Sequence, residues 1–243
     1  MKFVDGIRSD LVKVIHTPFA IIHTILPVAG ASLFTLYFLF YKNVAPASKI
    51  DFILELTAMV FPLLISIIVG LNISLEEKAS HFQTLLAVPC RGKIFLAKLI
   101  TLYFAGMLSL IALFVLFLLG ALLTGQVRSI PILFLLQAVF GLAVWNFVIY
   151  TLHLFLSFKF GLGSSLFWGV FESLQCILFS NIELQGAARL IPFAWSVEWI
   201  HDSMNKTMSN HIGIWGTAVV LTIAFVSVTV RWFIHWEGRK NYE

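Results

Sequence analysis

Polar and charged side chains inside apolar stretches are the first candidates for chemistry, because an ionisable group in hydrocarbon costs at least ~2.5–3.5 kcal/mol. Glu172 is the strongest of them. It belongs to a stripe at helical spacing that also contains Ser165, Gly169 and Gln175. Small residues let helices pack closely, and polar ones hydrogen-bond across the interface. We interpret the stripe either as a substrate path or subunit interface, or as a carboxyl group satisfied within its own bundle.

Two further polar groups occur at the same kind of spacing. Asn146, Tyr150 and His153 fall at positions i, i+4 and i+7. A single intramembrane histidine is more often a satisfied structural group than a proton relay, so a structural role is favoured. Asp51 and Glu55 lie one turn apart at the start of an apolar stretch. A cationic peptide could meet them there, but a solvated helix start, helped by the helix dipole, is the favoured interpretation.

The spacings that would indicate an enzyme or a metal site do not occur in the sequence. An intramembrane metalloprotease needs His-Glu-x-x-His or a similar cluster, and the 7 histidines are scattered. A glutamate protease needs Glu-Glu followed by Arg inside a span, whereas Glu76 and Glu77 fall in a polar connection. Cys90 and Cys176 have no metal-ligand spacing. We therefore expect no catalytic residues, no metal site and no cofactor.

The connection at residues 74–98, SLEEKASHFQTLLAVPCRGKIFLAK, is the most informative stretch of the chain. Ser74 and Glu77 have capping-box spacing, which predicts an amphipathic helix at about 75–88 that ends before Pro89. Two spans could be joined by far fewer residues, so this helix favours a docking element for a soluble partner over a plain interfacial helix. The predicted docking residues are Glu76, Glu77, Phe82, Leu86, Pro89 and Arg91.

Membrane-spanning helices must position these residues, because the composition leaves too little polar surface for water. The chain is 60% apolar and 12% charged, with a mean hydropathy of +0.96, against roughly 45–50% and about 25% in soluble domains. A bilayer core of about 30 Å needs about 20 apolar residues of helix. We predict one all-α integral membrane domain over residues 1–243, with six spans at 19–41, 52–72, 94–123, 130–156, 163–180 and 212–234.

The lysines and arginines predict the orientation of the spans. With the N-terminus inside, eleven of the 16 fall on the inner side and five on the outer side. This bias follows the positive-inside rule, so both termini are expected in the cytoplasm. The net charge of +4 then reflects contact with anionic inner-leaflet lipid, and nucleic acid is not an expected partner.

Two segments outside the spans are also predicted to be helical. Residues 1–17 place apolar side chains at helical spacing before Pro18, which predicts an amphipathic helix on the inner membrane surface. A solvated start of the chain is the alternative. The long outer connection at 181–211 contains Trp195 and Trp199 one turn apart. We expect a short external or partly re-entrant helix there, with these rings at the headgroup level.

The 74–98 connection resembles the intracellular coupling segment of type-2 ABC exporter permeases. That segment has acidic residues, a small residue, a Leu-Leu pair, a proline, then arginine and an apolar step ending in lysine. The family usually has Gly at the place of Ser80, and here Arg91 and Lys98 each come one residue early relative to the proline. The matching residues are Glu76, Glu77, Ser80, Leu85, Leu86, Pro89, Arg91 and Lys98.

The resemblance extends over the whole chain through the six spans, the N-terminal helix and a Pro-Trp segment before the last span. The size, the Phe-rich spans and the Trp-Glu-Gly-Arg-Lys tail are similar to the permeases of lantibiotic-immunity transporters. The resemblance implies a permease in the bacterial plasma membrane, paired with a second copy or a sister permease. It also implies separate ATPase subunits and export of an antimicrobial peptide for self-immunity.

The chain itself has no P-loop, since Gly92-Lys93 is followed by Ile94. ATP hydrolysis is therefore expected on another polypeptide. Two alternatives stay open. The exporter could carry a lipid, a polysaccharide or a drug, or the chain could be an ATP-independent secondary transporter or channel. The second alternative should show a broken helix or an ion-binding cluster near the midplane. Pro27 and Pro62 could break helices, but no group of carboxylates accompanies them.

Overall fold

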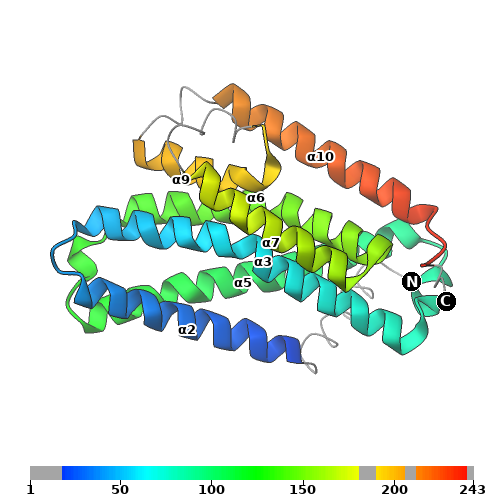
Figure 1. Ribbon diagram of the computed structural model, residues 1–243, viewed down its shortest axis with the longest axis horizontal. Helices are drawn as coiled ribbons and strands as arrows, with labels where there is room; N and C mark the ends of the chain where they lie inside the picture. The colour runs from blue at the N-terminus through cyan, green and yellow to red at the C-terminus, as the bar shows by residue number, and fades with distance from the viewer. Residues whose placement is uncertain (1–17, 181–189, 206–211, 240–243) are drawn as a thin grey trace.

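The computed structural model describes residues 18–180, 190–205 and 212–239, and every regular element in these ranges is a helix. Six of the helices are long and apolar enough to cross a membrane (Figure 1). They are α2 (Pro18–Phe40), α3 (Pro46–Ser80), α5 (Arg91–Leu123), α6 (Ile132–Phe160), α7 (Leu162–Phe179) and α10 (Ile212–Ile234). The predicted all-α fold and six spans are confirmed, and the length and composition of these helices make the chain a multi-pass membrane protein.

Short elements connect the long helices. They are α4 (Gln83–Leu86), the 3-10 turns η1 (Val127–Ser129) and η3 (Pro192–Ala194), and α9 (Trp195–Asn205). The helix predicted within 181–211 is present as α9. The amphipathic helix predicted at 1–17 lies outside the described residues.

The second span is longer than predicted, and the predicted start of a separate helix at Ser74 is wrong. α3 runs for 35 residues, about 52 Å, from Pro46 through Ser80. Between the predicted end of the span and Ser80 there is no proline or glycine, so the backbone hydrogen bonds continue past the capping-box residues. The helix ends only where His81 and Phe82 adopt left-handed φ values of 46° and 65°. What remains of the predicted coupling helix is the last turns of α3 and the single turn of α4.

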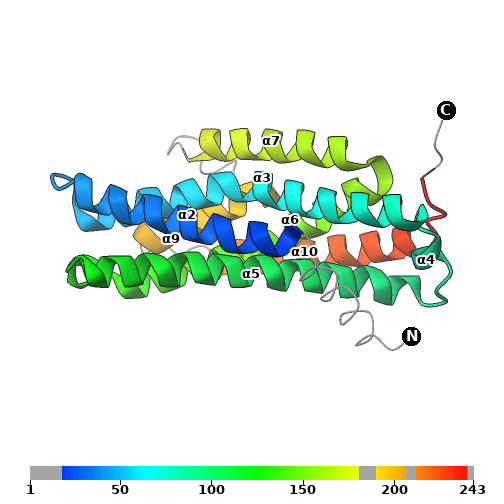
Figure 2. The same cartoon turned by 90° about the horizontal axis from the view of Figure 1, so that it is seen from below.

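The long helices alternate in direction, so the described chain begins and ends at the same end of the bundle (Figure 1). α3 is central and packs against α6, α7 and α9, while α2 packs mainly against α5. Figure 2 shows α7 on one side of α3 and α5 on the other. α10 packs on α5 and α6. The even number of passes agrees with the predicted topology, in which both termini lie on one side.

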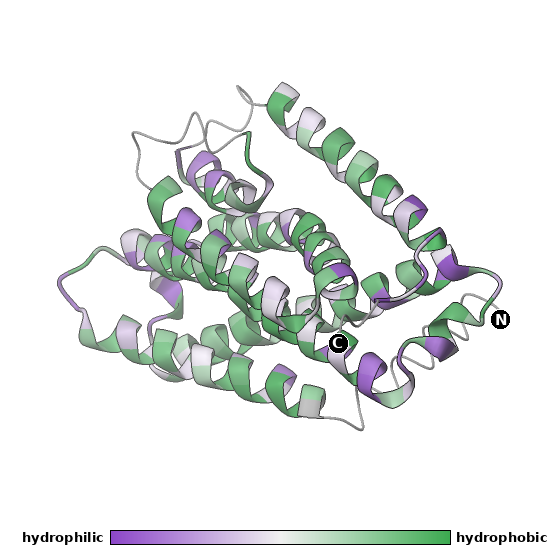
Figure 3. Cartoon of the chain, turned by 45° about the vertical axis from the view of Figure 1, so that its right-hand side comes forward, coloured by the Kyte–Doolittle hydropathy of each residue, from purple (hydrophilic) through white to green (hydrophobic). Residues whose placement is uncertain are grey.

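Hydrophobic residues cover most of the length of the helices, and hydrophilic residues gather at helix ends and in α9 (Figure 3). Many large apolar side chains point away from the bundle. Leu123 is 87% exposed, and Leu133 and Phe40 are each 76% exposed. A helix that is apolar all round belongs either in a large core or in a membrane. In a chain of this size these outward faces are the surfaces that contact lipid.

Candidate functional site

The two polar stripes seen in the sequence meet in the middle of the bundle. His153 on α6 lies between two residues of α7, with its Nε2 3.0 Å from Oε2 of Glu172 and its Nδ1 3.0 Å from Oγ of Ser165. The Ser165 hydroxyl donates to the backbone carbonyl of Ser66 on α3, at 3.2 Å. All four residues, which we name the buried polar chain, are 0% exposed. The structure thus joins three helices through one line of hydrogen bonds.

The hydrogen-bond directions in the buried polar chain fix its proton count. Ser165 has one hydroxyl proton, which goes to the Ser66 carbonyl because a carbonyl oxygen only accepts. Nδ1 of His153 must therefore donate to Ser165. A single proton then lies between Nε2 of His153 and Oε2 of Glu172, giving either an imidazolium and a carboxylate or two neutral groups. Both states carry no net charge, which is what complete burial requires.

One oxygen of Glu172 is left over. Its Oε1 atom is buried and has no hydrogen-bond partner among the described residues. A buried acceptor without a partner is costly, so this atom is the place in the polar chain where a further hydrogen-bond donor would be stabilised.

The other predicted members of the two stripes have different roles. Gly169 allows α7 to approach α3, since a Cβ atom there would lie 2.2 Å from Oγ of Ser66. Asn146 donates to the Leu142 carbonyl of its own helix. Gln175 is half-buried and makes no hydrogen bond within the described part of the chain.

A second group of functional candidates lies at the α3–α5 corner, residues 80–91, at one end of the bundle. Phe82 was predicted to dock a partner, but its side chain is 2% exposed and packs inside this chain. Its ring packs on Phe158 of α6 and on Trp236, at centroid distances of 5.9 and 5.1 Å. The left-handed backbone at His81 and Phe82 turns this ring inward.

Charged residues predicted to contact a partner also bind within the chain. Glu76 is buried on α3, and its Oε1 lies 3.0 Å from Nζ of Lys98 on α5. Nζ of Lys98 also donates to Oδ1 of Asn72, at 3.1 Å. These three residues join α3 to α5 on the bundle side of the corner.

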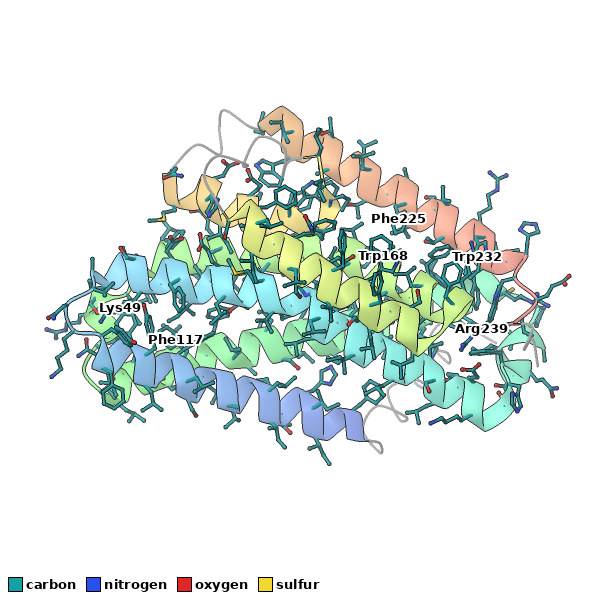
Figure 4. The ribbon with its side chains drawn as sticks, in the orientation of Figure 1. Lys49, Phe117, Trp168, Phe225, Trp232 and Arg239 are labelled. Carbon is teal, nitrogen blue, oxygen red and sulfur yellow. The ribbon has the colours of Figure 1, made fainter. Side chains whose placement is uncertain are left out.

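The segment after α10, residues 235–239, closes over the corner. Arg239 forms an ion pair with Glu77 and lies over the ring of Phe82, 5.3 Å from its centroid. Arg91 donates to the carbonyl of Trp236 at 2.9 Å. Figure 4 shows Arg239 at this end of the molecule, far from Lys49 and Phe117 at the other end. The Trp-Glu-Gly-Arg sequence of the tail therefore has a structural role in holding the corner.

The exposed part of the corner is small and mostly uncharged. Leu86 is half-buried, and its Cδ1 would lie 3.4 Å from a Cβ atom at Gly238. We name the exposed residues the corner tip: His81, Gln83, Thr84, Ala87, Pro89 and Cys90. Of the six predicted docking residues, only Pro89 belongs to the tip.

Trp195 and Trp199 belong to a cluster that the sequence did not predict. Trp195 is 1% exposed, so its ring packs inside the bundle and does not face lipid. It packs on Trp145 of α6 at 5.5 Å between ring centroids, and Trp145 stacks on Trp215 of α10 at 4.9 Å. Trp199 donates from Nε1 to the Gln137 carbonyl at 2.8 Å. The cluster fixes α9 against α6 and α10.

The predicted acidic pair near the start of α3 is covered by α9. Glu55 accepts a hydrogen bond from Nε2 of His201, and its side chain is still 21% exposed. The start of α3 is therefore partly solvated and also paired within the chain. Burial alone would lower the pKa of His201. The hydrogen bond to Glu55 and the charges of Glu55, Glu198 and Asp51 together raise the pKa of His201 above its usual value.

No protein-family model, no curated protein and no solved structure matches the chain. In the described ranges no group of three or more His, Cys, Asp or Glu side chains is arranged to hold a metal ion. Fold and composition define a multi-pass α-helical membrane protein, with six candidate spans in the described ranges.

Proposed function

We propose that this chain is the permease subunit of an ABC exporter in the bacterial plasma membrane, with ATP hydrolysis on separate subunits. The observation that carries the proposal is the α3–α5 corner. Its tip is exposed, while its base is tied to α3, α5, α6 and the segment after α10. A connection that only joins two spans has no need of such anchoring. An element that receives force from a soluble partner needs both features.

The contacts at the base of the corner connect it mechanically to the membrane-spanning helices. A close-packed interior has low compressibility and transmits displacement, so a partner that moves the tip also moves the ends of α3 and α5. α3 then continues without interruption from Ser80 to Ser66, about 21 Å along the helix axis. Ser66 belongs to the buried polar chain, which joins α3 to α6 and α7. Movement of the corner is thereby coupled to the packing of three spans.

The remaining subunits follow from the resemblance of the 74–98 connection to exporter permeases. One chain would supply half of the translocation path, so a second permease subunit, either a copy or a sister chain, and two ATPases complete the assembly. The proposed topology places the corner and both termini in the cytoplasm. Impermeant labelling of single cysteines at Lys42 and Arg128, but not at Lys159, of intact cells would support it.

A photoreactive amino acid at the corner tip tests the docking proposal directly. Gln83 and Thr84 are exposed, and Arg128 is an exposed matched position at the opposite end of the bundle. Irradiation of cells should cross-link the Gln83 and Thr84 variants to a protein that contains a P-loop, whereas the Arg128 variant should give no such product. Equal cross-linking from both ends, or none from the tip, would overturn the proposal.

The proposed cargo is an antimicrobial peptide of the lantibiotic type, removed from the membrane for self-protection. The 24 phenylalanines and the outward apolar faces offer a surface that an amphipathic peptide could share with lipid. Deleting the gene should raise the sensitivity of its host to one cationic peptide several-fold. If deletion instead alters surface polysaccharide or lipid composition, or sensitivity to a drug, the exporter carries that other cargo.

A proton-coupled secondary transporter is the second candidate, and the buried polar chain is the observation that favours it. His153 and Glu172 are hydrogen-bonded to each other and fully buried, and Oε1 of Glu172 is unpartnered within the described residues. In proteoliposomes without ATP, such a transporter would move cargo when a pH gradient is imposed. The ABC proposal predicts no transport under these conditions.

A further inference from the structure

Pro62 interrupts the backbone hydrogen bonds of α3 near the middle of the helix. Proline has no N–H group, and its ring presses on the carbonyl group four residues earlier, here that of Ala58. Proline is a main cause of sharp bends in helices, and α3 has no other proline after its first residue, Pro46. The turn at Pro62 is therefore the place where α3 bends most easily.

The two halves of α3, residues 46–61 and 63–80, are held by different parts of the bundle. In the first half, Glu55 accepts a hydrogen bond from His201 of α9. In the second half, Glu76 pairs with Lys98 of α5. A bend between the halves lets the second half tilt with the α3–α5 corner while the first half stays on α9.

α7 lies along α3 over the turn that follows the proline. Figure 2 shows α7 on the side of α3 away from α5. The hydroxyl oxygen of Ser173 accepts a hydrogen bond from the backbone N–H of Leu63, at 3.2 Å. One turn earlier on α7, a Cβ atom at Gly169 would lie 3.3 Å from Cα of Leu63. The two backbones are therefore in close contact at the first residue after Pro62.

A second hydroxyl group of α7 extends this contact along α3. Ser165 donates to the backbone carbonyl of Ser66, at 3.2 Å. Ser165, Gly169 and Ser173 are spaced four residues apart and so share one face of α7. This face meets residues 63–66 of α3, the turn directly after the proline.

We propose that the turn of α3 at Pro62 is a hinge, and that α7 holds it in one conformation through the hydroxyl group of Ser173. Ser173 bonds the amide next to the proline, so it fixes the direction in which α3 leaves the broken turn. Gly169 and Ser165 keep α7 against the same turn. The hinge does not depend on the proposed transport function, because neither an ATPase nor a cargo takes part in it.

The distance between two spin labels, measured by pulsed electron paramagnetic resonance, tests the hinge on the full-length protein in lipid nanodiscs. The labels are attached to cysteines at Lys78 on α3 and Lys159 on α6, which are both exposed, in a chain with Cys90→Ser and Cys176→Ala. Lys78 is about 24 Å along the helix axis from Pro62, so a further bend of about 20° moves it by about 8 Å.

Three substitutions separate the hinge from a general loosening of α7. The wild type should give one narrow distance distribution, and Ser173→Ala should add a second population displaced by up to about 8 Å. Ser180→Ala is the matched control, because that hydroxyl group donates to the Ile177 carbonyl of its own turn, and it should leave the distribution unchanged. Pro62→Ala restores the missing N–H group, and Ser173→Ala should have no effect in that background.

Each of the other outcomes would overturn the proposal. A broad distribution in the wild type would show that α7 does not hold the hinge in one conformation. A narrow distribution in Ser173→Ala would show that the hydroxyl group does not clamp it. A second population that persists when Ser173→Ala is combined with Pro62→Ala, or that also arises in Ser180→Ala, would show that the added motion does not come from the proline.

Discussion

The ion pair between Glu76 and Lys98 should be among the largest single contributions to the stability of the α3–α5 corner. Lys98→Met removes the cation and leaves the Glu76 carboxylate buried with a neutral side chain in front of it. At an effective dielectric constant of about 20, unit charges 3.0 Å apart attract each other by about 5–6 kcal/mol. Removing one partner of a buried pair costs about 3–5 kcal/mol, and we expect Lys98→Met to lower the free energy of unfolding by that amount.

A double variant and a surface control sharpen the measurement. Glu76→Leu combined with Lys98→Met removes both charges and should recover most of the loss, because two apolar side chains need no partner. Lys93→Met changes an exposed lysine of the same helix and should shift stability by no more than about 0.5 kcal/mol. Equilibrium unfolding in mixed detergent micelles, followed by tryptophan fluorescence, measures all four proteins. A single variant as stable as the wild type, or a double variant no better than the single one, would refute the reasoning.

Three further predictions concern the rest of the bundle. His153→Leu leaves both carboxyl oxygens of Glu172 without a partner and should lower the unfolding free energy by about 1–3 kcal/mol; adding Glu172→Leu should recover part of it, and an unchanged single variant would contradict the account. Gly106→Ala forces a methyl group into a tyrosine hydroxyl 1.8 Å away and should cost about 1–3 kcal/mol, whereas Gly216→Ala, with nothing within 4 Å, should gain up to about 1 kcal/mol. The pKa of His201 is raised in the folded protein. Its contribution to stability should therefore be complete below the ordinary pKa of about 6.5 and be lost as the pH rises through the folded value. A difference in unfolding free energy between wild type and His201→Phe that grows with rising pH would contradict this sign.

The spans could be predicted from the sequence because their signal is local. A run of about 20 apolar residues is needed to cross a bilayer whatever its neighbours are, and the last span, Ile212–Ile234, has the predicted bounds. The end of α3 was predicted wrongly because a capping box is also a purely local signal. A capping box indicates a helix start only if the preceding backbone is not already helical, and nothing before Ser74 interrupts α3.

The partners of the polar residues could not be predicted, because spacing within a helix identifies a face but not what it contacts. The stripes that contain His153 and Glu172 were both recognised, yet their pairing depends on how α6 and α7 pack. The burial of Phe82 could not be predicted, because the residues that cover it, Phe158 and Trp236, are far away in the sequence. The burial of Trp195 against Trp145 could not be predicted, because the packing of α9 on α6 leaves no local sequence pattern.

Purification of the chain with its native partners tests the central proposal most directly. We expect an affinity-tagged chain, extracted in mild detergent, to bring down an ATPase subunit with a P-loop in an amount equal to its own. Gln83→Lys combined with Thr84→Lys at the corner tip should remove that subunit, while the same gain of two charges by Gln126→Lys and Ser129→Lys at the opposite end of the bundle should not. Recovery of the chain without any nucleotide-binding protein, or full recovery of the ATPase with the altered tip, would contradict the account.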